Sequence, residues 1–403
     1  MGASFKSFLQ GRNVILGVTG SISAYKGVEM LRLLQDGGAR VRVVLSDGAL
    51  SFVTPLSFSP FAEKVYTPSD YFAGGVPHIE LASWGELLIV YPASADFIAS
   101  VAIGRADGLL ETVYMAFRGP KILAPAMNWR MFESSSMRRD LKLLKDEAVI
   151  IEPEEGFLAC GESGKGRLVS PDVAFFFAEK ALYEPKILKG LKVLVTAGPT
   201  REWIDPVRFI SNPSSGKMGY SVAYVASLMG AEVDLVSGPV NLTPPPSVRV
   251  YKVESAQDMF EVVRELFGSA SITVKSAAVS DFRPVRQSSS KIKKEGVSEL
   301  TVELAKNPDI LLELGRMKRI GQVLVGFALE TEDVFANAYK KLKEKGADFI
   351  VVNEATVGFG GDENEVAFVY PSGFVRFLPR LHKKRVAEEI LREANEIRLR
   401  CCR

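Results

Sequence analysis

Apolar and polar residues along this chain follow two spacings. Short continuous apolar runs, typical of strands buried on both faces, alternate with longer segments whose apolar positions recur at helical spacing. In the first half we predict strands over residues 14–18, 40–45, 86–91 and 121–124, and helices over 24–36 and 94–104. In the second half we predict strands over 191–196, 232–236, 271–274, 323–327 and 349–352, and helices over 215–229, 256–267 and 333–345. This alternation predicts an α/β protein with parallel sheets covered by helices on both faces.

A break near residue 188 divides the pattern in two. One helical stretch ends around Tyr183, Pro185 interrupts the chain, and a new apolar strand begins at residue 191. A chain of 403 residues has room for two or three domains at ~150 residues each. We therefore predict two doubly wound domains, over residues 1–188 and 189–403, that share an architecture without a convincing sequence repeat.

Charge and composition exclude several classes of protein. Fifty basic and 48 acidic residues leave a net charge of +2, too weak a field to indicate nucleic acid or an anionic membrane as partner. Two histidines and three cysteines are too few for a disulfide scaffold and nearly exclude a His/Cys zinc site. No uncharged apolar run reaches the ~18 residues of a membrane helix, and the first residues lack an export signal. We expect a cytoplasmic protein.

The segment GVTGSISAYK at 17–26 joins a predicted strand to a predicted helix. Gly20 permits a tight backbone turn, and Ser21 and Ser23 supply hydroxyls at the start of the helix. These features suit a phosphate monoester held by backbone amides. An ordinary turn with a serine cap is an equally good interpretation, since neither the Walker pattern nor G-x-G-x-x-G is present.

Three further segments of the first half carry candidate chemistry. His78 precedes an apolar strand that ends in YPAS, Asn128 lies in APAMNWRMF, and Cys160 lies in the glycine-rich GFLACGESGKGRL. A histidine can act as a base, an asparagine amide can hold a carboxylate, and a thiol can donate a proton. Taken singly, a surface histidine, a Pro/Asn turn and a small buried cysteine are the commoner interpretations.

Together and in this order, the four segments resemble the flavin-dependent phosphopantothenoylcysteine decarboxylases over residues 12–180. The resemblance implies a flavodoxin-like domain that binds FMN. His78 would be the catalytic histidine, Asn128 would bind the substrate carboxylate, and Cys160 would donate a proton. FMN would contact Gly20, Ser21, Ser23, Ser46, Pro92, Ala93 and Ser94.

The chemistry that this family performs explains why a flavin is needed. A carboxylate beside a simple thiol has no electron sink, so oxidation of the thiol carbon to a thioaldehyde must come before the loss of CO₂. The ene-thiolate that remains is then reduced, with a proton from Cys160. Two positions depart from the family pattern: Phe132 stands where tryptophan is usual, and Asp96 stands where asparagine is common.

The second half has its own polar segments after strands. Arg208 and Asn212 lie in TREWIDPVRFISNPSSGKMG, ahead of a helix start at 214–217 that suits an anion. Asp281 in KSAAVSDFRP could face a metal or a ribose. The charged residues KIKK at 291–294 lie within 286–296, which we predict to be a mobile loop. For this run a solvated charged surface is the usual interpretation, and simple solvent exposure is the alternative for Lys341 and Lys345, which share one helical face.

These segments resemble the phosphopantothenate–cysteine ligases over residues 190–400, and the tandem resembles the bacterial bifunctional coenzyme A biosynthesis proteins. The resemblance implies CTP as activating nucleotide, with Mg²⁺ held largely through the CTP phosphates and also by Asp281. Asn212 would stabilise an acyl-cytidylate, Arg208 would act near it, and Lys291 would close over the phosphates. CTP would contact Ser276, Ala277, Ala278, Asp281, Lys291, Pro308, Asp309, Ile310, Leu311, Phe327, Lys341 and Lys345.

The favoured hypothesis is an enzyme that joins 4′-phosphopantothenate to cysteine with CTP and then decarboxylates the product to 4′-phosphopantetheine. A non-catalytic flavin-binding regulator is an alternative, against which the intact His78, Asn128 and Cys160 argue. A nicotinamide-dependent oxidoreductase is another, against which the missing G-x-G-x-x-G argues. The family's trimeric decarboxylase and dimeric ligase contacts imply a homo-oligomer with shared active sites.

Overall fold

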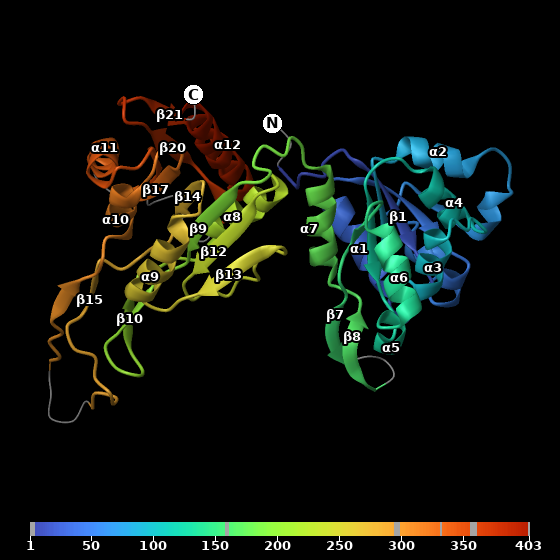
Figure 1. Ribbon diagram of the computed structural model, residues 1–403, viewed down its shortest axis with the longest axis horizontal. Coiled ribbons are helices and arrows are strands. Elements are labelled where there is room, and N and C mark those ends of the chain that lie inside the picture. Colours follow the sequence, from blue (N-terminus) through green and yellow to red (C-terminus); the bar gives the residue numbers. More distant parts are fainter. Residues whose placement is uncertain (1–4, 158–160, 294–298, 331–332, 355–360, 402–403) are drawn as a thin grey trace. The chain divides into compact units, whose positions relative to one another are not determined.

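The computed structural model describes the chain except for residues 1–4, 158–160, 294–298, 331–332, 355–360 and 402–403. The chain separates into two compact units, Met1–Tyr183 and Glu184–Arg403. We call them the N-terminal unit and the C-terminal unit. Each is built around a sheet of its own that carries helices on both faces (Figure 1).

The sheet of the N-terminal unit is parallel throughout. Its strands are β1 (Asn13–Val18), β2 (Arg40–Leu45), β3 (Lys64–Tyr66), β4 (Leu87–Ala93), β5 (Lys121–Pro125) and β6 (Val149–Ile150). They lie in the order β3-β2-β1-β4-β5-β6, which becomes the flavodoxin order when the short edge strand β3 is left out. The predicted α/β class and parallel sheet are confirmed here. The direction of winding reverses between β1 and β4, the point where ligands bind in such sheets.

Two layers of helices cover this sheet. α1 (Lys26–Asp36) and α7 (Pro171–Leu182) pack on one face, and their Leu31, Leu34 and Ala178 join one buried core. The other face carries α2 (Pro77–Trp84), α3 (Ala95–Ala102), α4 (Leu109–Ala116) and α6 (Ser135–Leu144). Because both faces are covered, every residue of β4 is buried, which explains its uninterrupted apolar sequence.

The sheet of the C-terminal unit has the order β13-β12-β9-β14-β17-β18-β20-β21. Its parallel strands are β9 (Lys192–Ala197), β12 (Glu232–Ser237), β13 (Val248–Lys252), β14 (Ile272–Lys275), β17 (Val323–Glu330) and β18 (Phe349–Glu354). The strands predicted for this half are parallel, but one edge carries two strands that the sequence did not reveal, β20 (Val366–Val369) and β21 (Val375–Phe377), and these pair antiparallel. A tight turn with Gly373 at φ 85° joins these two strands, so no crossover helix is needed.

Helices again cover both faces of this second sheet. α8 (Lys217–Leu228) packs with α12 (Lys383–Cys401) on one face. α9 (Ala256–Phe267), α10 (Ile310–Met317) and α11 (Val334–Lys345) share a buried core on the other. None of the helices described in either unit is both long and apolar enough to cross a membrane.

Two small antiparallel pairs extend from the C-terminal unit. β10 (Arg201–Trp203) pairs with β11 (Phe209–Ser211), and β15 (Phe282–Pro284) pairs with β16 (Leu304–Lys306). β10 and β15 lie in contact, and both run away from the sheet to which β9 and β14 belong (Figure 1). The segment that carries Lys291 lies between β15 and β16, so this extension positions it.

Candidate functional site

A cavity of about 860 Å³ opens in the N-terminal unit at the carboxyl ends of the strands. Its wall comes from the loops after β1, β2, β4 and β5, and from the hairpin β7 (Glu154–Phe157) and β8 (Ser163–Arg167). The strand order reverses at this edge, so the cavity lies where a doubly wound sheet binds its ligand. Of the predicted FMN residues, Gly20, Ser21, Ser23, Ser46 and Ser94 line it.

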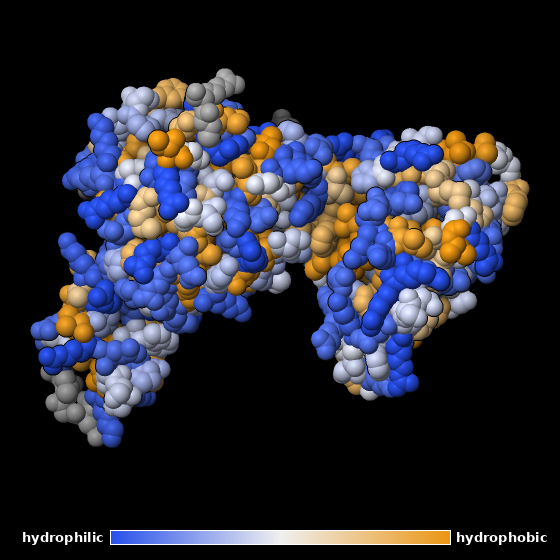
Figure 2. Space-filling view, viewed as in Figure 1, coloured by the Kyte–Doolittle hydropathy of each residue, from blue (hydrophilic) through white to orange (hydrophobic). Residues whose placement is uncertain are grey.

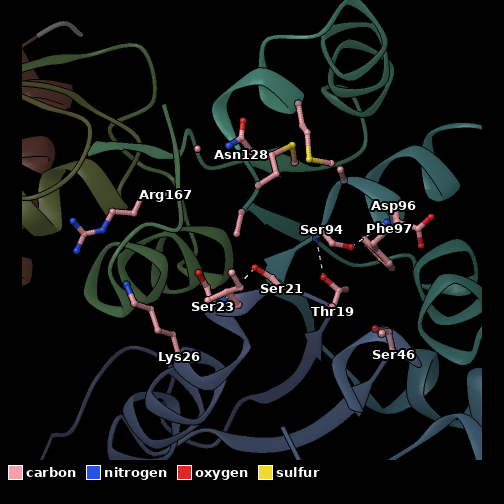
Figure 3. A pocket seen from close by; sticks show the side chains of 18 of the residues that line it. Thr19, Ser21, Ser23, Lys26, Ser46, Ser94, Asp96, Phe97, Asn128 and Arg167 are labelled. Carbon is pink, nitrogen blue, oxygen red and sulfur yellow. Dashed lines mark hydrogen bonds between the residues drawn. The ribbon is translucent and has the colours of Figure 1, made fainter. Parts of the chain in front are cut away.

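The turn after β1 forms one end of the cavity. Ser21 caps the short helix η1 (Ile22–Tyr25), and its Oγ accepts a hydrogen bond of 3.2 Å from the Ser23 amide. The cations Lys26 and Arg167 lie on the same side of the cavity as Ser23 (Figure 3). Hydroxyls, amides and two cations on one side of a cavity suit a phosphate monoester. The sequence indicated the serines, whereas the contribution of Lys26 requires the fold.

The loops after β1 and β2 approach each other closely beside this turn. A Cβ on Gly20 would lie 3.0 Å from the Gly48 backbone, so a larger residue would push the loops apart. The Thr19 hydroxyl accepts from the Ser94 amide at 2.7 Å and donates to the Pro92 carbonyl at 2.8 Å. Pro92 and Ala93 therefore belong to the buried end of β4, and Ser94 is the residue of this segment that reaches the cavity.

The opposite end of the cavity is acidic. Asp47, Asp96 and Glu111 line it, and Figure 3 shows Asp96 across the cavity from Lys26. Burial, with the nearby Asp96 and Asp107, raises the pKa of the Glu111 carboxyl above its usual range. The cavity is thus electrically polar, with cations around the serine turn and carboxylates at the other end. Asp96, one of the two departures from the family pattern, is part of the acidic end.

Asn128 reaches the cavity from the end of β5. It caps the short helix α5 (Trp129–Phe132), and its Oδ1 accepts from the Arg130 amide at 2.9 Å. Glu162 ties the β7–β8 hairpin to this helix, because it accepts a hydrogen bond of 2.8 Å from the Trp129 indole. Cys160 lies outside the described residues. The strands on either side of it contribute Phe157, Gly166 and Arg167 to the cavity.

His78 does not line this cavity. It is half-buried near the start of α2, and its ring lies edge-on to the Tyr71 ring, with 6.0 Å between the two ring centroids. Within the described part of the chain its buried Nδ1 has no hydrogen-bond partner. Tyr71 lines a second cavity of about 340 Å³, which shares Ser46 and Asp96 with the first. Asn128 lines the larger cavity and His78 does not, so one copy of the chain does not place both residues in that cavity.

A second candidate site lies in the C-terminal unit, where β9 and β14 end side by side. The Ser276 hydroxyl donates to the Thr196 carbonyl at 2.6 Å, and the Ala277 amide donates to the Thr196 hydroxyl at 3.2 Å. The Ala278 amide donates to the Gly198 carbonyl at 2.9 Å. The three predicted residues thus form the turn at which this sheet also reverses its winding.

Four predicted CTP residues gather around a lysine that the sequence reasoning missed. Burial, and then the neighbouring Lys341, lower the pKa of Lys275 to about 8, while Asp309 and Asp281 act in the opposite direction. Lys345 forms an ion pair with Asp309, which caps α10. Lys341 and Lys345 therefore act from one face of α11, as their spacing predicted. Lys275 could have been noticed as the one charge that ends the apolar run 272–275.

The remaining nucleotide candidates lie on the elements next to this cluster. Ile310 and Leu311 are buried in the first turn of α10, directly after Pro308 and Asp309. Phe327 is half-buried on β17, and the preceding Gly326 is where β17 packs against Leu311. Lys291 is exposed in the segment between β15 and β16.

Asn212 and Arg208 have different surroundings. The Asn212 side-chain amide donates to the Val279 carbonyl at 3.0 Å, next to the turn at 276–278. The Arg208 guanidinium instead pairs with Asp205, a carboxylate that the sequence reasoning missed. Among the residues that the structure describes, no three His, Cys, Asp or Glu side chains are grouped so as to hold a metal ion. Asp281 therefore lacks the partners of a protein-only metal site in that part of the chain.

Comparison with known proteins finds a matching family for each half of the chain. The flavoprotein family model matches residues 3–177, and the model of the DNA/pantothenate metabolism flavoprotein C-terminal domain matches residues 188–397. The coenzyme A biosynthesis bifunctional protein CoaBC of Haemophilus influenzae is 41% identical over 396 residues, covering 96% of this chain and 98% of its own length. The chain belongs to the CoaBC family.

Other members of the family are similarly close. The CoaBC of Bacillus subtilis is 42% identical and that of Escherichia coli K12 is 39% identical, each covering 96% of this chain and 97% of its own length. Among solved structures, the C-terminal domain of a CoaBC protein is 46% identical, with a TM-score of 0.46, over 53% of this chain and 98% of its own. A PPC decarboxylase mutant complexed with pantothenoylaminoethenethiol is 28% identical, with a TM-score of 0.39, over 42% of this chain and 97% of its own.

Proposed function

We propose that this chain carries out two consecutive steps of coenzyme A biosynthesis. The domain over residues 189–403 joins 4′-phosphopantothenate to cysteine with CTP, and the domain over residues 1–188 decarboxylates the product to 4′-phosphopantetheine. Full-length similarity to the CoaBC proteins supports this assignment. The function proposed for the first domain rests on the polar cavity, whose cationic end suits the FMN phosphate.

In the ligation, the chain holds the phosphates of CTP and protects the acyl-cytidylate from hydrolysis. The 4′-phosphopantothenate carboxylate attacks the α-phosphate of CTP and pyrophosphate leaves; the cysteine amine then attacks the acyl-cytidylate and CMP leaves. Lys291, Lys341 and Lys345 would balance the negative charge that grows on the phosphates. Asn212 would donate a hydrogen bond to the acyl-cytidylate. Mg²⁺ would bind mainly through the phosphates, since the described residues offer it no grouped carboxylates.

In the decarboxylation, the first domain binds and orients. FMN, when bound, supplies the oxidation and reduction that make loss of CO₂ possible. Lys26, Arg167 and the Ser21–Ser23 turn would hold its phosphate, and Gly20 leaves room for close approach of the backbone. Asn128 would hold the substrate carboxylate, and Cys160 would donate the final proton.

His78 would act in a site formed between two copies of the chain. It lies away from the cavity that Asn128 lines, so a neighbouring copy is the source that completes the site. Phe72, Val76 and Ile79, in α2 or just before it, are exposed. Figure 2 shows apolar residues among polar ones on the surface of the N-terminal unit. The β10–β11 and β15–β16 pairs expose Phe209, Phe282 and Leu304 in the same way. We propose trimeric contacts for the first domain and dimeric contacts for the second, in a cytoplasmic enzyme.

Product analysis tests both halves together. The purified chain is incubated with 4′-phosphopantothenate, cysteine, CTP and Mg²⁺, and the products are identified by mass spectrometry. We expect 4′-phosphopantetheine, pyrophosphate and CMP, and a flavin absorption spectrum in the protein. Accumulation of 4′-phosphopantothenoylcysteine without decarboxylation would contradict the role of the first domain. Absence of pyrophosphate would contradict the role of the second.

A further inference from the structure

A fully buried carboxylate, Asp205, lies in the turn between β10 and β11. Its Oδ1 accepts hydrogen bonds from the Val207 amide at 2.8 Å and the Arg208 amide at 2.9 Å. Its Oδ2 accepts from the Arg208 guanidinium, with a distance of 3.0 Å to Nε, and from the Ile292 amide at 3.2 Å. The hydrogen bond from Arg208 holds the pKa of this carboxyl well below its usual range, so the pair stays ionised at neutral pH.

The same pair holds a distant segment of the chain by its backbone. Arg208 Nη2 donates to the Ile292 carbonyl at 2.8 Å, while the Ile292 amide donates to Asp205. The Ser288 amide donates to the Ile204 carbonyl at 2.9 Å as a second connection between the two segments. The described part of the loop that we predicted to be mobile, residues 286–293, is thereby tied to the β10–β11 turn.

Ile292 is flanked by two exposed lysines, Lys291 and Lys293. A lysine side chain is long and loses conformational freedom when it binds an anion. If the backbone around the lysine is also unfixed, it must become ordered when the anion binds, and the affinity for the anion falls further. Fixing both the amide and the carbonyl of Ile292 removes this second cost, because the backbone next to Lys291 is ordered before the anion arrives.

We propose that the Asp205–Arg208 pair is a positioning device that presents Lys291 to the nucleotide triphosphate in the ligation step. The inference rests on the proposed function of Lys291. It assigns Asp205 a role, and it gives Arg208 a role through Ile292 that does not require contact with the acyl-cytidylate. Both are positioning residues, and neither needs to touch a reacting atom.

The same unit offers a matched control. Asp234 on β12 is 5% exposed, and its Oδ1 accepts from Nε of Arg249 on β13 at 2.8 Å. This pair has the chemistry of Asp205 and Arg208, but it joins two neighbouring strands and does not hold the segment that carries Lys291. Breaking either pair lowers the stability of the unit. Only breaking the Asp205–Arg208 pair also releases the segment that carries Lys291.

The test compares Asp205→Asn with Asp234→Asn in the full-length protein with FMN bound. An asparagine at 205 keeps the size but replaces one acceptor oxygen with a donor, which cannot accept from Arg208 or Ile292. We expect amide hydrogen exchange over residues 288–293 to rise about tenfold or more, and KM for CTP in pyrophosphate release to rise about tenfold, as the loss of a charge-assisted hydrogen bond implies. Decarboxylation of supplied 4′-phosphopantothenoylcysteine should keep its rate. Asp234→Asn should leave KM for CTP unchanged.

Two further variants make every outcome decisive. Lys291→Gln tests the proposed function: an unchanged KM for CTP removes the role of Lys291 and the positioning proposal with it. If Lys291→Gln raises KM for CTP and Asp205→Asn does not, the positioning proposal alone is overturned. It is also overturned if Asp205→Asn and Asp234→Asn raise KM for CTP equally.

Arg208→Lys replaces Asp205→Asn as the test if Asp205→Asn fails to fold, since it keeps the charge and loses the planar fork that reaches Ile292. The proposal requires it to raise exchange over residues 288–293 and KM for CTP together.

Discussion

Asn212 is a residue at which one atom decides the expected phenotype. Its side-chain amide donates to the Val279 carbonyl, so an aspartate there would place a carboxylate oxygen against a carbonyl oxygen. We expect Asn212→Asp to lower ligation by about a hundredfold or more, as for the loss of a donor to a charged intermediate. Decarboxylation of supplied 4′-phosphopantothenoylcysteine is the control measurement, and it should stay within about twofold. An equal fall in both activities would contradict independent sites.

Lys275 makes the stability of the second unit depend on pH. Its folded pKa of about 8 lies below its ordinary value of 10.5, so the unfolded chain binds the extra proton between these two values. Stability therefore rises with pH across this window. Lys275→Met should raise the free energy of unfolding at pH 7 by on the order of 2–3 kcal/mol, and the advantage should shrink from pH 8 to about 10.5.

Chemical denaturation at several pH values measures this effect. Lys252→Met, at an exposed position of β13, is the matched control and should shift stability little at any pH. The difference in free energy of unfolding between the Lys275→Met protein and the unmodified chain should therefore shrink as the pH rises. If this difference stays constant from pH 7 to 10, the charged ammonium of Lys275 does not destabilise the unit.

At the scale of single residues, the sequence revealed which residue types carry the chemistry, but it did not reveal which residues they contact. The serines of the turn after β1 and the lysine pair on α11 were visible because polar residues follow apolar runs or share a helical face. Asp205 was not visible, because its partner Ile292 lies 87 residues away and offers only backbone atoms. Lys26 was missed for a similar reason: only the fold brings Arg167 to the same end of the cavity.

At the scale of elements, the β7–β8 hairpin has a glycine, Gly166, at which a side chain would strike the backbone of a neighbouring loop. A Cβ on Gly166 would lie 2.2 Å from the Met127 carbonyl, whose own amide donates to the Gly166 carbonyl at 3.1 Å. Gly166→Ala should therefore displace the hairpin from the loop of Asn128 and weaken FMN retention by about tenfold or more, since packed backbone cannot give way.

Equilibrium dialysis followed by flavin fluorescence gives the FMN affinity of each variant. Gly156→Ala on the paired strand is the matched control, because its Cβ would meet only the Arg167 side chain at 3.4 Å. The interpretation would be wrong if both alanine variants retained FMN equally well.

Most predicted strands and helices are present with ends shifted by a few residues. The strand at Arg40–Leu45 and the helix at Ala256–Phe267 have the predicted bounds, since strong apolar periodicity determines both. The elements that the sequence did not reveal are short or polar. The hairpin of β7 and β8 contains glycines and charges, and the β10–β11 pair holds three residues in each strand. Their pairing depends on tertiary neighbours, which no local pattern records.

At the scale of the whole molecule, the two units have separate hydrophobic cores and separate sheets. A ligand that binds one folded unit stabilises that unit by mass action. We expect two thermal transitions, of which FMN at about a hundred times its dissociation constant raises only one, by about 2.7 kcal/mol in free energy. Differential scanning calorimetry with and without added FMN measures this, and CTP serves as the ligand for the other transition. A single transition that both ligands shift would contradict separate cores.

The cavity that we propose as the FMN site is lined by residues of the N-terminal unit, and this has a consequence for synthesis of the chain. All six strands of that sheet have been made when the ribosome reaches Glu184. At ~5–20 residues per second, the remaining chain takes on the order of 10–40 s to complete. Domains of this size fold within that time, so the N-terminal unit can take up its flavin while the C-terminal unit is still being translated.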